Sequence, residues 1–456
     1  MNYPGNRSCK TLFRIGHLAV IALLVTACTG ETSLPVASGD ADVRMINAIP
    51  TSPSLSFLIE ERPIGTADYK GVSSPVTYDN LKYTFNIEAF LAGDATRSRL
   101  ASMELDVIND FDYTFLVSGP LATPTLTLWE TARREWAGTE TVFQARFAHT
   151  AESLGPIDVY FQAPGIAPAA GLEAGTLAFT EVLPAFDYPA GDYVLIFTTA
   201  GDPNDILFTS NTVTPALQTG FLVSIFDADA NDLGSVAVRL FGDSGGSTNL
   251  PDVNSTPTIR LFHATPNLET ADIYTDELVT EQLLSDHAFR DVTGDLPLAA
   301  GSYTFTYTSA GNVGSILFEG DVAIQQGNHY DYYVVGEAGA LLGIQEIPDR
   351  RSVETLVKFS FLHTATNHDS VDLYIVTAGT DIASVLPRIA NLTIGSSSAG
   401  LSLQAGDFEL YLTPRAEKTV LAGPIAFSPQ VGDIANFISY DNVDPAIADV
   451  VMIPPP

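Results

Sequence analysis

The fold of this protein can be inferred from the stretch Thr258-Ile-Arg-Leu-Phe-His263-Ala-Thr and the Ala271-Asp272-Ile-Tyr274 that follows it. Apolar and polar side chains alternate along the first segment, so that Leu261 and His263 share one face and Arg260 lies on the other. An alternation with period two is typical of a β-strand with one buried face. The stretch therefore predicts two short strands joined by a loop.

The same pattern occurs in two further places and, in degenerate form, in a third. The clear copies are Phe143-Gln-Ala-Arg-Phe-Ala-His149-Thr with Ile157-Asp158-Val-Tyr160, and Val357-Lys-Phe-Ser-Phe-Leu-His363-Thr with Val371-Asp372-Leu-Tyr374. In all three clear copies Asp follows His by nine residues, and Tyr follows Asp by two. The degenerate copy comes first in the chain and carries Asn47 and Ser56 at the same spacing.

The repeat divides the chain into units of domain size. Successive His-equivalent positions lie 102, 114 and 100 residues apart, and each unit also has a glycine turn and a late apolar strand, such as Tyr330-Asp-Tyr-Tyr-Val-Val. Short alternating strands between turns favour small sandwiches. We therefore predict an all-β protein of four tandem Ig-like antiparallel β-sandwich domains in a row, with repeats at 42–138, 143–242, 258–350 and 356–453 and a linker at 243–257.

The pattern Arg-x-x-His, then Asp-hydrophobic-Tyr, then Ala-Gly-x-Tyr resembles the DUF4397 family of exported bacterial proteins. The resemblance covers nearly all of residues 42–453, with the first copy matching least. It implies tandem copies behind a lipoprotein signal, and it adds no activity.

The first 27 residues have the features of a secretory signal. Arg7, Lys10 and Arg14 form a basic start, and the apolar run Leu18-Ala-Val-Ile-Ala-Leu-Leu-Val25 is shorter than the roughly 20 residues that span a bilayer. The stretch Leu24-Val25-Thr26-Ala27-Cys28 resembles the lipobox of bacterial lipoproteins, which implies cleavage before Cys28 and acylation of that cysteine.

The segment after the cysteine predicts where the protein is held. Residues 28–41 are polar enough to serve as a tether. Thr29, in place of Asp, resembles the pattern of Gram-negative lipoproteins that are sent to the outer membrane. We therefore expect a protein exported to the cell envelope and held in the membrane by lipid on Cys28.

The composition excludes several partners. The chain has 54 acidic against 21 Lys and Arg residues, a formal charge of −33, and loss of residues 1–27 removes three basic groups and makes it −36. Such a surface repels nucleic acid and anionic lipid headgroups. The only cysteines are Cys9 and Cys28, so no disulfide can join the predicted domains.

The repeated His, Asp and Tyr residues are the first candidate site: His149, Asp158, Tyr160, His263, Asp272, Tyr274, His363, Asp372 and Tyr374. One interpretation is a binding or general-base site in each domain. The other is structural, with a buried imidazole that donates to the Asp or to loop backbone and fixes the turn. Recurrence in tandem favours the structural interpretation, because one catalytic site would suffice.

Two other motifs suggest chemistry. Gly242-Asp243-Ser244-Gly245-Gly246 looks like a serine protease nucleophile motif, but it lies in the predicted linker with Ser247 where that family has Pro. Asp227-Ala-Asp229-Ala-Asn231-Asp232 begins like a calcium loop, although position six is Asp and position twelve is Val238. Asp227, Asp229 and Asn231 are therefore weak calcium candidates in a hairpin turn.

These observations predict a non-enzymatic envelope protein whose β domains form an array for binding, adhesion or spacing at the cell surface. A polysaccharide or another envelope or surface protein would be its partner. Two alternatives remain open from the sequence: a hydrolase of extracellular polymers using a His/Asp site, and a calcium-stiffened rod.

Overall fold

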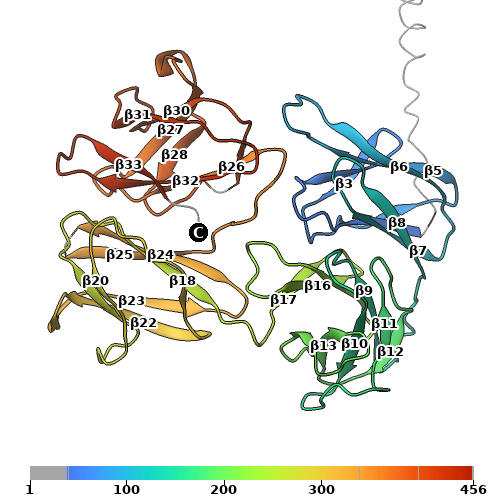
Figure 1. Cartoon of the computed structure of the whole chain (residues 1–456). Helices are drawn as coiled ribbons and strands as arrows, with labels where there is room; N and C mark the ends of the chain where they lie inside the picture. Colours follow the sequence, from blue (N-terminus) through green and yellow to red (C-terminus); the bar gives the residue numbers. More distant parts are fainter. Residues whose placement is uncertain (1–38, 40, 338, 399, 454–456) are drawn as a thin grey trace, which may run out of the picture.

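The computed structural model describes residues 39, 41–337, 339–398 and 400–453, which form four consecutive β domains (Figure 1). The predicted signal peptide, Cys28 and most of the predicted tether lie outside the described residues. Within the described ranges there is no α-helix, only a 3-10 turn, η1 (Ile382–Ser384), and no helix that could cross a membrane. The prediction of four tandem β-sandwiches is confirmed.

Each domain contains two sheets, which we call inner and outer. The inner sheets of domains 1 and 2 contain, in order across the sheet, β4 (Val76–Tyr78), β1 (Ala41–Asn47), β7 (Phe111–Ser118) and β8 (Thr125–Ala132) in domain 1, and β12 (Phe186–Pro189), β9 (Val142–His149), β15 (Gly220–Asp227), β16 (Val236–Gly242) and β17 (Ser247–Leu250) in domain 2. Those of domains 3 and 4 contain β21 (Leu296–Pro297), β18 (Thr258–His263), β24 (His329–Glu337) and β25 (Ala340–Glu346) in domain 3, and β29 (Leu401–Leu403), β26 (Val357–His363), β32 (Ile434–Asp441) and β33 (Ala448–Ile453) in domain 4.

The outer sheets contain the second, third, fifth and sixth strands of each domain. In order across the sheet they are β3 (Arg62–Ala67), β2 (Leu55–Ile59), β5 (Lys82–Ala89), β6 (Ser98–Asp106); β11 (Gly175–Leu177), β10 (Ile157–Gln162), β13 (Val194–Thr199), β14 (Ile206–Thr209); β20 (Gln282–His287), β19 (Ala271–Tyr274), β22 (Gly301–Ser309), β23 (Asn312–Ile324); and β28 (Ile389–Thr393), β27 (Ser370–Thr377), β30 (Phe408–Pro414), β31 (Ala422–Phe427).

The strand order refines the predicted fold. In every domain the first and seventh strands pair in parallel, as β1 does with β7, and the other neighbouring strands pair antiparallel. Immunoglobulin constant domains place the first, second, fourth and fifth strands in one sheet. These domains therefore share the two-sheet architecture of Ig domains and group their strands differently.

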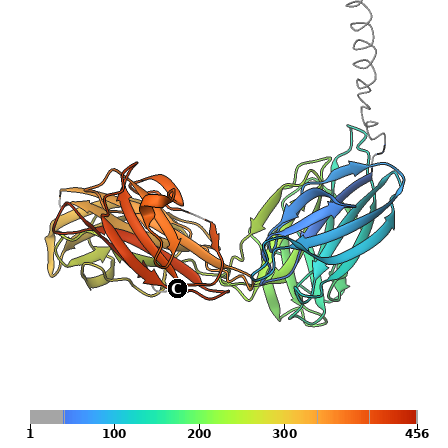
Figure 2. The same cartoon turned by 90° about the horizontal axis from the view of Figure 1, so that it is seen from above.

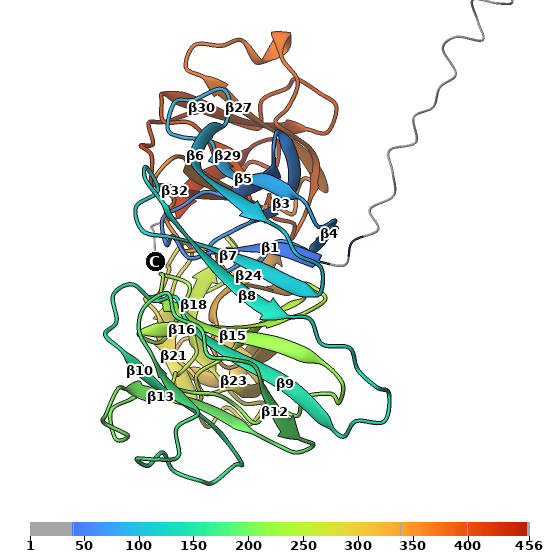
Figure 3. The same ribbon diagram turned by 90° about the vertical axis from the view of Figure 1, so that its right-hand side faces the viewer.

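The domains pack in pairs through the outward faces of their inner sheets. Along β18, Ile259 and Leu261 face the core of domain 3, whereas Phe262 faces domain 4 and stacks on Tyr333 at a centroid distance of 4.3 Å. Domains 1 and 2 share a second such cluster, which includes Leu116 and Phe226. Figure 2 shows the two resulting lobes, and Figure 3 shows the lobe of domains 1 and 2 in front of the other lobe.

This pairing differs from the predicted row of domains. The row was inferred from the four repeats alone. The central strands of the inner sheets also carry apolar residues on their outward faces, as β18 does with Phe262, and these residues are buried against the neighbouring domain. The predicted linker also differs, since Ser247–Leu250 forms β17 on the inner sheet of domain 2.

The segment between domains 3 and 4 holds the two lobes together. The Arg351 guanidinium donates to the carbonyl oxygens of Pro50 (3.1 Å) and Ser52 (2.8 Å) in domain 1. The backbone N–H of Arg350 donates to Oδ1 of Asn231 in domain 2 at 2.6 Å. The chain thus runs from domain 3 to domain 4 through contacts with both domains of the other lobe.

Candidate functional site

The repeated histidines are buried at the ends of the first strands of domains 2, 3 and 4. His149, His263 and His363 are at most 1% exposed. In each, Nε2 lies near a carbonyl oxygen of the following loop, at 3.0 Å for Gly155, 3.4 Å for Glu269 and 2.7 Å for His368. Because a carbonyl oxygen only accepts, Nε2 carries the proton and donates it to the loop.

The second ring nitrogen is also engaged. Nδ1 of His149 accepts the N–H of Ala151 (3.3 Å), and Nδ1 of His363 bonds the Ser439 hydroxyl (2.8 Å). Burial lowers the pKa of all three imidazoles and favours the neutral form. With both nitrogens occupied, these rings have no free lone pair to take a proton from a substrate.

Domain 1 fills the same place with an amide. Asn47 Oδ1 accepts the N–H of Ile49 (3.0 Å), two residues on, as Nδ1 of His149 does. Its Nδ2 donates into the following loop, to the hydroxyl of Ser52 (2.8 Å). The amide therefore reproduces both hydrogen bonds of the imidazole and keeps the turn without a titrating group.

The repeated aspartates tie the outer sheet together. Each accepts the N–H of a residue with positive φ in the hairpin after the fifth strand: Gly201, Gly311 and Ala416, all at 2.8 Å. Each also accepts a bond from the third strand, as Asp158 does from the Thr176 hydroxyl and Asp372 from the N–H of Asn391. The carboxylate thus joins the second strand to both of its neighbours.

The His and Asp of one repeat therefore have separate partners. The histidines bond the loop beside the inner sheet, and Asp158, Asp272 and Asp372 bond within the outer sheet. Tyr160, Tyr274 and Tyr374 are buried two residues beyond each Asp. Alternate residues share a face of a strand, so each Tyr lies on the face of its Asp.

We expect His363→Ala to lower the free energy of unfolding of domain 4 by about 2 to 4 kcal/mol, because it leaves a cavity and removes two buried hydrogen bonds. His363→Asn should cost about half as much, since Asn47 makes both bonds in domain 1. Hydrogen exchange of domain 4 peptides measures this difference. Equal losses in the two variants would show that the hydrogen bonds contribute little.

The predicted calcium loop is occupied by protein groups. Asp229 pairs with Lys70 of domain 1 at 2.9 Å, and both side chains are at least nine-tenths buried. The carboxylate of Asp227 accepts the N–H of Ser153 at 3.1 Å, and Asn231 is engaged by Arg350. Among the described residues no cluster of three His, Cys, Asp or Glu side chains suits a metal. This loop joins domains, with Lys70 as its cation.

The glycine-rich motif at 242–246 forms the turn between β16 and β17. The N–H of Gly242 donates to Gly246 O at 2.9 Å, and Gly245 has a φ of +93° with Pro75 of domain 1 packed against it. Phe221 on β15 lies opposite Gly242 on one side and opposite Ala145 of β9 on the other. Ala145 precedes His149 by four residues, so the turn and His149 are about 13 Å apart along the strand direction. His149 therefore cannot activate Ser244, and the motif is a docking turn.

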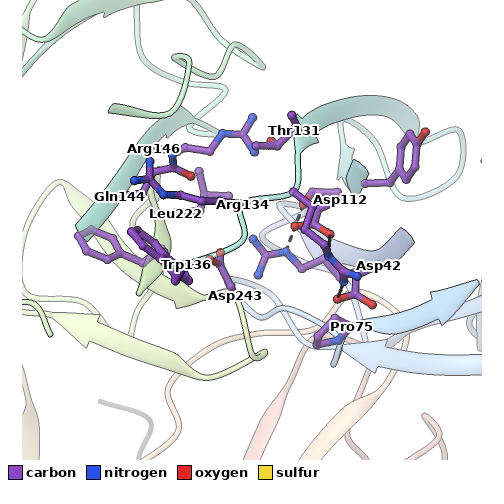
Figure 4. Close-up of a pocket in the computed structure, with 17 residues that line it drawn as sticks. Asp42, Pro75, Asp112, Thr131, Arg134, Trp136, Gln144, Arg146, Leu222 and Asp243 are labelled. Atoms are coloured by element: carbon purple, nitrogen blue, oxygen red, sulfur yellow. Dashed lines mark hydrogen bonds and ion pairs between the residues drawn. The ribbon is translucent and has the colours of Figure 1, made fainter. Parts of the chain in front are cut away.

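A cavity of about 220 Å³ lies where domains 1 and 2 meet, beside this turn. Its polar walls include Asp42, Asp112, Asp243 and Arg146 (Figure 4). Figure 4 shows Asp42 and Asp112 on one side, and Arg146 and Asp243 on the other. Sequence reasoning missed this cavity, because its walls come from strands of two domains.

Buried charge gives the cavity its character. Burial, and the nearby charge of Arg44, lower the pKa of Arg146 to about 10. Burial also raises the pKa of Asp112 and of Asp243. The lining contains four arginines against three aspartates, whereas the whole chain carries −33. Cationic donors are therefore concentrated at this interface.

The sequence matches the family model described as Domain of unknown function (DUF4397) at residues 41–160 and 257–374, together 238 of 456 residues. The chain belongs to the DUF4397 family. Each match begins at the first strand of one lobe and ends at the repeat Tyr of the next domain, Tyr160 or Tyr374.

Other comparisons add little to the family assignment. No curated protein matches the chain. The solved structure of the Bacillus anthracis TIE protein is similar at 10% identity, covering 95% of this chain and 80% of that one, with a TM-score of 0.15. A likeness of this size supports no inference about function.

One buried histidine of this DUF4397 protein lies outside the repeated pattern. The His287 ring lies 5.8 Å from that of His263, and its Nε2 contacts Asp291 O at 3.2 Å. Burial, with the nearby His263, lowers the pKa of His287 to about 4. Nothing local in the sequence marks it, because the β20 strand brings it to His263 only on folding.

We expect domain 3 to lose stability as the pH falls below about 6.5, where an unfolded histidine takes up a proton. The folded state keeps His287 neutral until about pH 4, so the unfolded state binds more protons between these values and stability falls with falling pH. The loss from His287 is about 2 kcal/mol at pH 5. Hydrogen exchange of domain 3 at pH 7.5 and 5 measures it. His287→Gln should flatten the dependence, and an unchanged slope would contradict this assignment.

Proposed function

We propose that this DUF4397 protein is a non-enzymatic lipoprotein of the cell envelope, held by acyl chains on Cys28 at the Gram-negative outer membrane. Its four sandwiches act as a two-lobed scaffold for binding, adhesion or spacing. The observation that carries the proposal is that the polar side chains shared by the repeats are used in holding each domain together. A scaffold needs such groups in every copy, whereas a catalyst needs them free.

The partners of the candidate side chains disfavour the two alternatives. A hydrolase needs an imidazole with a free nitrogen near its partner, but both nitrogens of His149 and of His363 have partners. A calcium-stiffened rod needs carboxylates free for the ion, but Asp229 is paired with Lys70. A polysaccharide or another envelope protein remains the proposed partner, since the acidic surface repels nucleic acid.

Metabolic labelling with palmitate in the native host tests the anchor. The full-length protein should incorporate label and sediment with outer membranes, and Cys28→Ala should do neither. Two or more acyl chains bind a membrane stably, so the difference between the variants should be nearly complete. An unlabelled wild-type protein would refute lipidation. Crosslinking in intact cells, followed by pull-down, then tests for the partner.

A further inference from the structure

Three residues before each repeat His lies a position that distinguishes the domains. It is Arg44 in domain 1, Arg146 in domain 2, Arg260 in domain 3 and Ser360 in domain 4. In domain 3 the guanidinium forms a two-bond ion pair with Asp331, its neighbour on the parallel seventh strand, at 2.8 and 2.7 Å. Domain 3 thus shows how the fold neutralises this arginine.

Domains 1 and 2 lack that neutralising carboxylate. The neighbour of Arg44 is Thr114, and the neighbour of Arg146 is Leu222. Arg44 donates to the hydroxyl of Thr114 (3.1 Å) and to Gly242 O (2.9 Å), but it forms no ion pair in the described part of the chain. Within the same ranges the side chain of Arg146 forms neither hydrogen bond nor ion pair, and its Nε is buried.

Both of these guanidiniums line the 220 Å³ cavity between the two domains. The other two arginines of the lining are neutralised: Arg133 by Asp42 and Asp112, and Arg134 by Glu140 and Asp187. Asp243 also faces the cavity, and its charge is felt by Arg44 and Arg146. The cavity therefore contains the guanidiniums of Arg44 and Arg146, whereas the equivalent Arg260 in domain 3 is paired with the carboxylate of Asp331.

We propose that Arg44 and Arg146 bind an external carboxylate carried on a ring, in place of the carboxylate that Asp331 supplies in domain 3. A planar guanidinium fork matches a carboxylate with two parallel hydrogen bonds. The three aspartates in the walls repel a dianion more than a monoanion, which favours a carboxylate over a phosphate. This site deepens the binding role proposed above.

The ring is inferred from the space beyond the charged cavity. An apolar groove of about 500 Å³ adjoins it and shares Trp136, Phe221 and Asp243 with its lining. Leu240 and Pro215 continue the groove. The Arg134 guanidinium lies over one face of Trp136, 4.2 Å from the ring centroid. A carboxylate held by the arginines would place a ring against the other face, which suits both aromatic and sugar rings. An aromatic acid and a uronic sugar share this chemistry.

Calorimetric titration of the purified full-length protein with benzoate and with D-glucuronate tests the site. Neutral benzamide and glucose are the matched controls and should give no binding. Trp136 is one of only two tryptophans, so its fluorescence should change with the ligand and the change should be lost in Trp136→Phe. Binding by one acid alone identifies the source as aromatic or sugar, and either result supports the proposal.

Variants locate the binding in the cavity. Arg146→Gln should weaken it by about tenfold or more, because a charge-assisted hydrogen bond is lost. Thr114→Asp should weaken it similarly, because it gives Arg44 the in-sheet carboxylate that Arg260 has in domain 3. Arg239→Gln is the control, since its Nε is also buried without a partner but it lies outside the cavity lining.

Three results would overturn the proposal. They are no binding of either acid at millimolar concentration, binding of acetate and phosphate as tight as that of the ring acids, and equal weakening by Arg239→Gln. None of them depends on lipidation, so a wild-type protein that takes up no palmitate label but still binds the acids would refute the anchor and keep this site.

Discussion

Replacement of Asp331 by Ala should lower the free energy of unfolding of the lobe formed by domains 3 and 4 by about 3 to 5 kcal/mol. Its carboxylate makes two bonds to Arg260, and the two side chains are 5% and 3% exposed. Removal of one partner leaves a guanidinium in a site that excludes water. The cost comes from that uncompensated charge and not from the net strength of the ion pair.

Denaturant unfolding of the full chain, with hydrogen exchange to assign the loss to domain 3, measures this effect. The double change Arg260→Met with Asp331→Leu should recover most of the stability, because apolar groups of similar size remove both buried charges. Glu61→Ala is the matched control, since its pair with Arg99 is 83% and 42% exposed and should cost less than about 1 kcal/mol. Similar losses for Asp331→Ala and Glu61→Ala would contradict the expectation.

Phe226→Asp should separate domains 1 and 2 without unfolding either domain. Phe226 is fully buried between the domains, with its ring 6.1 Å from those of Tyr69 and Phe241. A carboxylate without a partner in this cluster costs several kcal/mol. The residue faces the neighbouring domain rather than the core of its own, so the cost falls on the interface.

Small-angle scattering should show a larger radius of gyration for this variant, and the fluorescence of buried Trp129, which bonds Thr180 O of domain 2, should shift to the red. Far-ultraviolet circular dichroism should keep its β signal. Leu172→Asp, at a residue 55% exposed, should change none of these measurements. A compact Phe226→Asp protein would show that other contacts hold the lobe.

The repeated motif predicted the individual domains well because its information is local. Alternation over six to eight residues selects strands, and the nine-residue spacing between His263 and Asp272 fixes the loop between the first two strands. The structural interpretation predicted a buried imidazole that donates to the Asp or to loop backbone. In the structure the His263 ring contacts loop backbone, and Asp272 bonds within the outer sheet.

A signal for the pairing was present in the sequence. Tyr330-Asp-Tyr-Tyr-Val-Val has apolar residues at consecutive positions, as does Leu261-Phe262, and a strand that is apolar on both faces is buried on both. Such runs predict that the second face of the strand is buried, but they do not identify the domain that covers it. The sequence likewise could not show that Asp229 pairs with Lys70, since Lys70 belongs to another domain.

The sequence by itself determined the strands, the four repeats and the family, because each depends on residues close together along the chain. Tertiary structure alone decided which domains pair and which charges meet. Arg44 and Arg146 occupy equivalent places 102 residues apart, and only the packing of two inner sheets brings both to one cavity. Burial at this cavity removes water from the two guanidiniums and so favours an anionic partner, and no spacing in the sequence specifies that burial.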